Sequence, residues 1–206
     1  MNIVRELPVI VTSMDFPLTN EEFYKSIAQE TARMSYPGSM SRGTKPVVRK
    51  GTKFALEKYY VQKFPLNQVL SSLNHITVFD QWHKARTNEI AIALKRYIPE
   101  YNNSAGVSAK FLNTFMHQLM KYKQYQVLWP VLHLPLDAKV FNKLKQIKYK
   151  SLDHVQPLFS YSPYHLSYSR YLNIQQALEG LLQELNNRRG AEFKLTSRIE
   201  LNFLWL

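Results

Sequence analysis

The chain of 206 residues has no cysteine, few glycines and no long hydrophobic run. Without cysteine it forms no disulfide and no thiolate zinc site, and it has no cysteine nucleophile. Only 6 glycines are present and clusters of turn residues are rare, which argues against a sandwich or barrel of many short strands. No apolar stretch reaches the ~20 residues of a membrane span, and the first residues do not follow the pattern of a signal peptide. We therefore expect a cytoplasmic protein without a membrane partner.

Acidic residues are scarce relative to basic ones. Lysine and arginine number 27 against 15 aspartate and glutamate residues, a formal net charge of +12. An excess of this size indicates an anionic partner, and nucleic acid is the commonest one. A basic surface without a partner would have the same composition. No histidine pair stands at a helical metal spacing, so we expect neither a metal nor a cofactor.

The hydrophobic pattern is that of a mainly α protein. Hydrophobic residues make up 45% of the chain, too much for a disordered protein, and we expect a monomeric single domain over 1–206. Residues 1–52 form a partly irregular N-terminal segment with a strand-like stretch at 8–13, and residues 53–206 form the helical core. Apolar residues at spacings of three and four, with caps and prolines as boundaries, predict helices over 20–34, 54–64, 66–76, 78–98, 109–123, 138–150 and 171–190. Two prolines predict that residues 126–137 cross the fold in extended form.

A loop over residues 35–53 contains five basic residues and no acidic one. Such a loop is suited to following a phosphate backbone, although a solvated connection would have the same composition. The basic residues are Arg42, Lys45, Arg49, Lys50 and Lys53.

Residues 101–152 contain eight lysines, no arginine and a single acid, Asp137. Asp137 directly precedes the predicted helix 138–150, and Lys110 lies at the start of the predicted helix 109–123, behind a turn at Gly106. Nearby cations should keep the carboxylate ionised. A helix N-cap, a purely structural role, would by itself also explain Asp137.

The segment "AGVSAKF" resembles the glycine hairpin of the helix-hairpin-helix DNA glycosylases, whose lysine-bearing members read Gly-Val-Gly-Thr-Lys here. Gly106, Val107 and Lys110 match that pattern, whereas Ser108 replaces the second glycine. The resemblance implies the multi-helix fold of that superfamily, in a diverged branch similar to the 8-oxoguanine glycosylases.

The same family continues through an apolar helix to a segment of the form Val-Pro-Val-Asp-x-x-Val, and "LPLDAKV" is similar to it at Pro135, Asp137 and Val140. The two matches together span about 35 residues. The interval from Lys110 to Asp137 is longer than in the best-known branch of the family.

The resemblance implies excision of a modified or damaged base that has left the DNA stack, with strand cleavage as a second activity of some members. Asp137 would stabilise the positive charge that develops on the sugar. Lys110 would be the amine nucleophile that forms a Schiff base with the sugar. Backbone around Gly106 and Ser108 would approach a DNA phosphate, and Lys139 would also contact DNA.

Further residues are candidates for contacts with the substrate. Asn113, three residues beyond Lys110, could orient the lysine, and His133 could contact a base or phosphate; the structural alternative for each is a buried hydrogen-bonded group. Trp82 and His83 stand as a pair on the helix 78–98, where Trp82 follows the apolar stripe of the core. Aromatic side chains in loop-like sequence could stack on bases: Trp129, Tyr161, Tyr164, Tyr168 and Tyr171.

Two other functions are compatible with the same residues. In one, the protein is a non-enzymatic nucleic-acid-binding module and Asp137 is only a helix cap. In the other, the protein engages an acidic partner protein and has no affinity for nucleic acid. Convergence of Lys110 and Asp137 on one open site would favour the glycosylase over the binding module.

Overall fold

The computed structural model describes residues 20–41, 45–69, 76–188 and 194–203. The described chain is mainly helical and compact, as the hydrophobic pattern predicts. The strand-like stretch at 8–13 lies outside the described residues. The principal helices are α1 (Asn20–Ser35), α2 (Thr52–Gln62), α3 (Ile76–Ala93), α4 (Ser104–Leu119), α5 (Ala138–Leu144) and α6 (Tyr168–Arg188).

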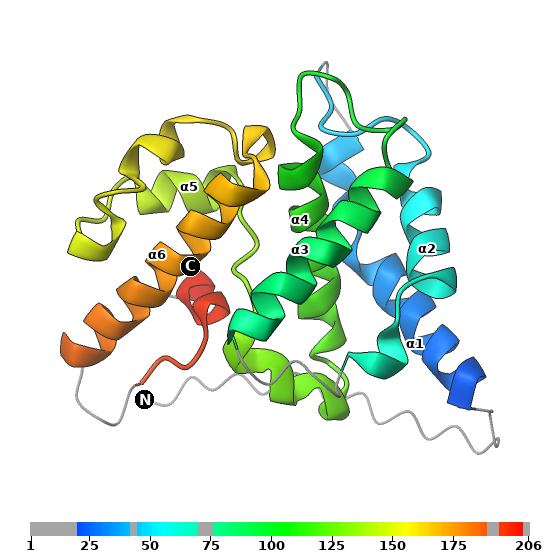
Figure 1. Cartoon of the computed structure of the whole chain (residues 1–206). Coiled ribbons are helices and arrows are strands. Elements are labelled where there is room, and N and C mark those ends of the chain that lie inside the picture. Colours follow the sequence, from blue (N-terminus) through cyan, green and yellow to red (C-terminus); the bar gives the residue numbers. More distant parts are fainter. Residues whose placement is uncertain (1–19, 42–44, 70–75, 189–193, 204–206) are drawn as a thin grey trace.

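The helices surround two separate apolar clusters. In Figure 1, α1 to α4 lie on one side of the molecule and α5 and α6 lie on the other. The first cluster is built from α1 to α4 and the 3₁₀ segment Lys123–Val131. The second is built from α5, α6 and the turns between them. Helix α4 belongs to both, because Phe111 and Phe115 pack in the first cluster and Ala109 packs in the second.

Helix α4 begins earlier than the sequence predicts. The side chain of Asn103 accepts a hydrogen bond from the amide of Ala105 at 2.9 Å and so caps the helix at Ser104. The prediction of a turn at Gly106 is therefore wrong, because Gly106 lies buried inside the first turns of α4. A Cβ atom there would stand 2.6 Å from the carbonyl oxygen of Pro163. Glycine is required at this position by the close approach of another backbone segment.

Helix α5 confirms the cap predicted at Asp137. The residue has extended backbone angles, and its Oδ1 atom accepts from the amide of Val140 at 2.9 Å. The helix ends at Leu144, six residues before the predicted end. Lysines at 145 and 148 would stand on one face of a longer helix, and like charges at that spacing are unfavourable.

The connection from α4 to α5 is extended only in its second half. Residues Lys123–Val131 form a 3₁₀ helix that includes Pro130, so the extended conformation predicted there is wrong. The φ angle imposed by proline suits a 3₁₀ turn as well as an extended chain. Residues 132–137 are free of helix. The helix predicted over 66–76 is represented by the 3₁₀ turn Leu66–Gln68, and residues 70–75 lie outside the described chain.

We expect Gly106→Ala to destabilise the protein. Overpacking of a tight site costs about 1–3 kcal/mol, and the higher helix propensity of alanine offsets up to about 1 kcal/mol of that cost. The matched control is Gly38→Ala, because a Cβ atom at Gly38 meets no atom within 4 Å. Urea unfolding should show a lower midpoint for Gly106→Ala alone. Equal midpoints for the two variants would contradict the close approach of residues 163–166 to α4.

Candidate functional site

Lys110 and Asp137, 27 residues apart in sequence, meet in the fold. The Nζ atom of Lys110, in the second turn of α4, donates to Oδ2 of Asp137 at 3.1 Å. The other carboxylate oxygen of Asp137 caps α5. The lysine side chain is 10% exposed and the aspartate side chain 34% exposed. The pair thus joins two helix starts, and its carboxylate remains accessible from solvent.

The carboxylate of Asp137 is held in its ionised form. Burial alone raises the pKa of Asp137, but the charge of Lys110 and hydrogen bonds from Lys110 and from the amides of Val140 and Lys139 together lower it below its usual value. A stable negative charge at this position could stabilise a cation that develops beside it.

Tyr164 is a third titratable group close to the pair. Burial, and secondarily the charge of Asp137, raise the pKa of the Tyr164 hydroxyl. Its backbone carbonyl accepts from the amide of Asn103 at 2.8 Å, which holds the segment before α6 against the start of α4. The exposed ring of Tyr161 is nearby in sequence and has the guanidinium of Arg170 5.9 Å from its centre.

The extended segment that carries Asp137 is attached to α6. Gln175 of α6 exchanges two hydrogen bonds with the backbone of Leu134, at 3.0 and 2.8 Å. Such a pair substitutes for one rung of a β ladder and satisfies a buried peptide unit. The position of Asp137 therefore depends on α6 as well as on its own helix.

A chain of buried hydrogen bonds lies between the two apolar clusters. Asn113 of α4 contacts Nε2 of His83 at 2.9 Å through its side-chain oxygen and donates to the hydroxyl of Tyr171 at 2.8 Å. The Tyr171 hydroxyl contacts Nδ1 of His133 at 2.8 Å, and Nε2 of His133 lies 2.7 Å from Oδ1 of Asp80. The chain connects α3, α4, α6 and the extended segment.

The partners in this chain select one tautomer for each histidine. Nε2 of His83 must donate, because it faces the amide oxygen of Asn113. Nδ1 is then an acceptor, with the hydroxyls of Tyr168 at 2.9 Å and Thr87 at 3.4 Å. The Tyr171 hydroxyl accepts a hydrogen bond from the amide of Asn113, so its own hydrogen is free to be donated to Nδ1 of His133. The remaining nitrogen of His133 donates to the carboxylate of Asp80.

His83 and His133, the two histidines of this hydrogen-bond chain, are neutral at neutral pH. Burial lowers the pKa of His83 well below its usual value, helped by the positive charge available to His133. Burial and the charge of Arg198 do the same to the pKa of His133. Burial also raises the pKa of the neighbouring Asp80 carboxyl, against the lowering effect of the charge of Arg198.

These contacts correct three predicted substrate contacts. Asn113 contacts Tyr171 and His83 and does not orient Lys110. His83 and His133 are both buried, and a buried hydrogen-bonded group is the structural alternative given above for His133. None of the three can touch DNA in this structure. One feature of the sequence indicates these buried hydrogen bonds: the polar residues His83 and Thr87 stand on one face of a helix with an apolar stripe.

The remaining aromatic candidates divide by exposure. Trp82 packs against the first cluster, as predicted. Trp129 also packs there and donates to Glu200 at 3.1 Å, so its ring is not a free stacking surface. Tyr168 and Tyr171 lie buried in α6, and their predicted role in stacking is wrong. Tyr161 is exposed and Tyr164 half-buried.

The predicted phosphate contacts also divide. Lys45, Lys50 and Lys139 are exposed, and Arg49 is exposed while one of its guanidinium nitrogens donates to the carbonyl of Arg96. Gly106 and Ser108 are buried in α4, so the predicted approach of their backbone to a phosphate is wrong. Arg42 lies outside the described residues.

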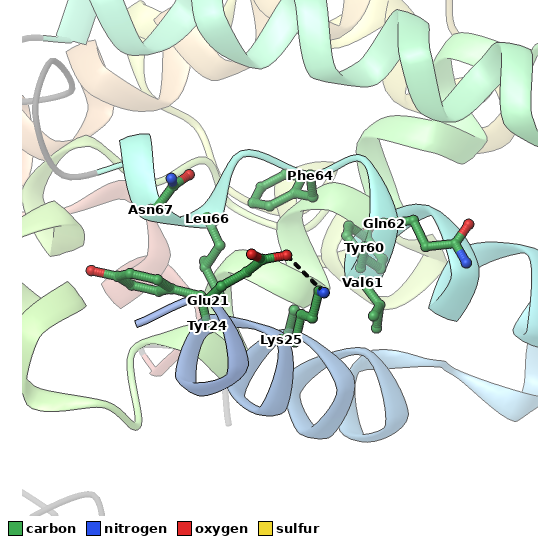
Figure 2. Close-up of a pocket in the computed structure, with 10 residues that line it drawn as sticks. Glu21, Tyr24, Lys25, Tyr60, Val61, Gln62, Phe64, Leu66 and Asn67 are labelled. Carbon is green, nitrogen blue, oxygen red and sulfur yellow. Dashed lines mark ion pairs between the residues drawn. The ribbon is translucent and has the colours of Figure 1, made fainter. Parts of the chain in front are cut away.

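A cavity of about 580 Å³ lies between α1, α2 and the turn that follows α2. Figure 2 shows the residues that line it. An exposed ion pair between Glu21 and Lys25, 2.8 Å apart, crosses its rim. Neither Lys110 nor Asp137 lines this cavity. A smaller cavity of about 260 Å³ includes Thr114 and Pro135 in its wall, close in sequence to the pair.

Within the described ranges, no group of three or more histidine, aspartate and glutamate side chains could hold a metal ion. Among the helices that the structure describes, none has both the length and the apolar character needed to cross a membrane. Comparison of the chain with known protein families, curated proteins and solved structures finds no match.

We expect the free energy of unfolding to fall as the pH is lowered from 7.5 to 5.5. The pKa of His83 and of His133 is lower in the folded protein than the value of about 6.5 in the unfolded chain. Their contribution is therefore present above that pH and lost below it, by about 1.4 kcal/mol per pH unit for each group. Urea unfolding at several pH values measures the slope.

Two variants control this measurement. His83→Gln should be less stable at pH 7.5 and should show a shallower slope, because one titrating group has gone. His154→Gln removes an exposed histidine and should leave the slope unchanged. A free energy of unfolding that stays constant from pH 7.5 to 5.5 would contradict the neutral buried pair.

Proposed function

We propose that the protein is a DNA glycosylase that uses Lys110 and Asp137 to excise a modified or damaged base. The observation that supports this function best is the 3.1 Å contact between the two side chains, which the chain brings together across 27 residues at a partly exposed position. The resemblance of "AGVSAKF" and "LPLDAKV" to the lysine-bearing glycosylases assigns a chemical role to each of these two residues.

The proposed reaction begins with departure of the base. The electrons of the bond between C1′ and the base nitrogen leave with the base, and positive charge develops on the sugar. The ionised carboxylate of Asp137 stabilises that charge. The ammonium of Lys110 gives up one proton, which neutralises the departing base, and the resulting amine attacks C1′. As the sugar ring opens, the bond between C1′ and O4′ breaks, a second proton passes from the nitrogen to O4′, and the carbon–nitrogen double bond of the Schiff base forms.

The direct contact between the pair has a consequence for substrate binding. In the free protein one N–H of Lys110 is committed to Asp137. The sugar must lie between or beside these two groups for attack to occur, so substrate must displace the lysine from the carboxylate. Asp137 is the more exposed partner and is held by the cap on α5, so Lys110 is the group that moves.

The multi-helix fold of the glycosylase superfamily is part of this proposal. Support comes from the position of Lys110 near the start of an apolar helix and of Asp137 at the start of the next α-helix. The hairpin part of the resemblance is weakened, because Gly106 lies within α4. The proposal therefore depends on the pair and not on a phosphate-binding hairpin.

Exposed lysines around Asp137 supply the DNA-binding part of the proposal. Lys139 and Lys143 of α5, together with Lys145 and Lys148 that follow it, are exposed. Phosphate contacts from such residues provide affinity without sequence preference and release counterions. The DNA backbone would thus lie along α5, with the target nucleotide at its first residue.

A non-enzymatic nucleic-acid-binding module is the second candidate. It is favoured by the fact that Asp137 already has two structural roles, as a cap and as the partner of Lys110. In that function the same lysines bind phosphates and no base is released.

Borohydride trapping tests the chemistry. We expect the wild-type protein to form a covalent adduct with duplex DNA containing an abasic site. We expect Lys110→Ala to reduce the adduct by at least about 100-fold, since Lys110 is the lysine that contacts Asp137 in the described chain. Lys58→Ala, an exposed lysine on α2, is the control and should trap like the wild type. An adduct that survives Lys110→Ala excludes this nucleophile, and the lack of any adduct or excised base with the wild type supports the binding module.

Two substitutions of Asp137 separate its structural and catalytic roles. Asparagine is as good an N-cap as aspartate, whereas alanine loses about 1 kcal/mol of helix stabilisation. Asp137→Asn should therefore remain the more stable of the two in urea, while both variants lose base excision. Excision by Asp137→Asn at the wild-type rate would contradict an electrostatic role for the carboxylate.

The salt dependence of DNA binding tests the surface. Replacing both Lys139 and Lys143 by alanine should lower the slope of log K against log salt concentration by about 2, close to one unit per phosphate contact. Replacing Lys58 and Lys63, exposed at the end of α2, should leave the slope unchanged. Fluorescence anisotropy of labelled duplex DNA measures both. Equal slopes for the two double variants would place the DNA on another face.

A further inference from the structure

A cavity of about 260 Å³ lies beside α4, on the C-terminal side of Lys110. Thr114 lines it, and the hydroxyl of Thr114 donates to the carbonyl of Lys110 at 3.0 Å. One turn of an α-helix rises by about 5.4 Å. Pro135 also lines the cavity and precedes Asp137 by two residues in extended chain, roughly 7 Å. The two elements that carry the ion pair therefore also contribute residues to the wall of the cavity.

The lining of the cavity carries no formal charge. Among the described residues that line it, the polar members are hydroxyls, an imidazole and a carboxamide, and none is a lysine, arginine, aspartate or glutamate. Burial, and secondarily the charge of Lys121, lower the pKa of His117, so the imidazole is neutral at neutral pH. In a chain with a net charge of +12, an uncharged cavity is poorly suited to a phosphate and well suited to a neutral ligand.

Two polar atoms of the lining residues have no hydrogen-bond partner. They are Nδ1 of His117 and Oε1 of Gln118, both buried. A buried polar atom without a partner costs free energy. A ligand in the cavity that offers complementary groups would remove that cost once the side chains turn toward it, since neither atom is accessible to solvent in this structure. The ring of Tyr36, which is stacked on Phe111 with an interplanar angle of 7°, gives the same cavity an aromatic wall.

We infer that this cavity receives the extruded base, and that the base is an uncharged heterocycle whose polar edge bonds to His117 and Gln118. This inference rests on the proposed function, because it assumes that the sugar lies at Lys110 and Asp137. The volume is just below the 300–1,000 Å³ typical of sites for drug-sized ligands, which suits one planar ring system without its sugar. Aromatic and polar pockets of this kind are what extruded bases require.

The absence of a carboxylate from the lining selects among classes of modified base. A base that carries a positive charge, as ring-alkylated purines do in DNA, would need a nearby anion to offset its desolvation. Oxidised and deaminated bases are neutral and present both N–H and C=O groups along one edge. The cavity therefore selects oxidised or deaminated bases over alkylated ones.

The experiment compares two reactions that differ only in the need for a base. Gln118→Leu and His117→Phe remove the polar atoms and keep the approximate volume, and Gln124→Leu, exposed beyond the end of α4, is the matched control. We expect the first two variants to excise hypoxanthine, uracil or 8-oxoguanine from duplex DNA at least about tenfold more slowly than the wild type. Borohydride trapping on abasic DNA, which has no base to bind, should stay within about twofold.

Binding of free bases tests the cavity without any chemistry. Calorimetric titration of the wild type with hypoxanthine, uracil and 8-oxoguanine should detect binding of at least one base, and Gln118→Leu should lose it while Gln124→Leu keeps it. If the wild type traps abasic DNA but Gln118→Leu excises bases normally, or no free base binds, the cavity is not the base site and the proposed function stands. If free bases bind at Gln118 but nothing is excised or trapped, the proposed function fails while the base site stands.

Discussion

Two hydrogen bonds of Asn113 position the candidate site. They join α4 to His83 of α3 and to Tyr171 of α6, one helical turn beyond Lys110. Gln175, one turn further along α6, holds Leu134 in the segment that delivers Asp137. The amine and the carboxylate are thus both located relative to α6. A lysine and an aspartate contributed by different parts of the chain can meet at 3.1 Å only because these contacts leave the three elements one arrangement.

The polar character of the boundary between the two apolar clusters explains that uniqueness. Apolar surfaces can slide against each other at little cost, whereas the hydrogen bonds among His83, Asn113 and Tyr171 form in only one register. The cost of burial is visible in the lowered pKa of both histidines and in Arg198, which is fully buried, donates to the carbonyl of Val131 and leaves its Nε and Nη1 atoms without a hydrogen-bond partner. We suggest that the chain retains these groups for the geometry they impose and not for stability.

The sequence predicts best what is decided locally. The apolar spacing of α3 and the cap at Asp137 depend on neighbouring residues, and both predictions are confirmed. The turn at Gly106 was wrong because the backbone that approaches it comes from residues 163–166, which no local pattern reveals. The predicted substrate contacts of Asn113 and His133 fail for the same reason, since their common partner Tyr171 lies 58 and 38 positions away. The convergence of Lys110 with Asp137 was predicted only through the resemblance to a family.

Stability alone is a poor explanation for the Lys110–Asp137 pair. Asp137 caps α5 through Oδ1, and that role needs no lysine. Ordering a lysine side chain costs up to about 2 kcal/mol of conformational entropy, and an ion pair with a solvent-accessible partner returns little, because water screens it. If position 110 had only a structural role, an apolar residue would suit it as well, because the side chain there is only 10% exposed. The amine at 110 is thus a group that the proposed function uses and that the cap on α5 does not.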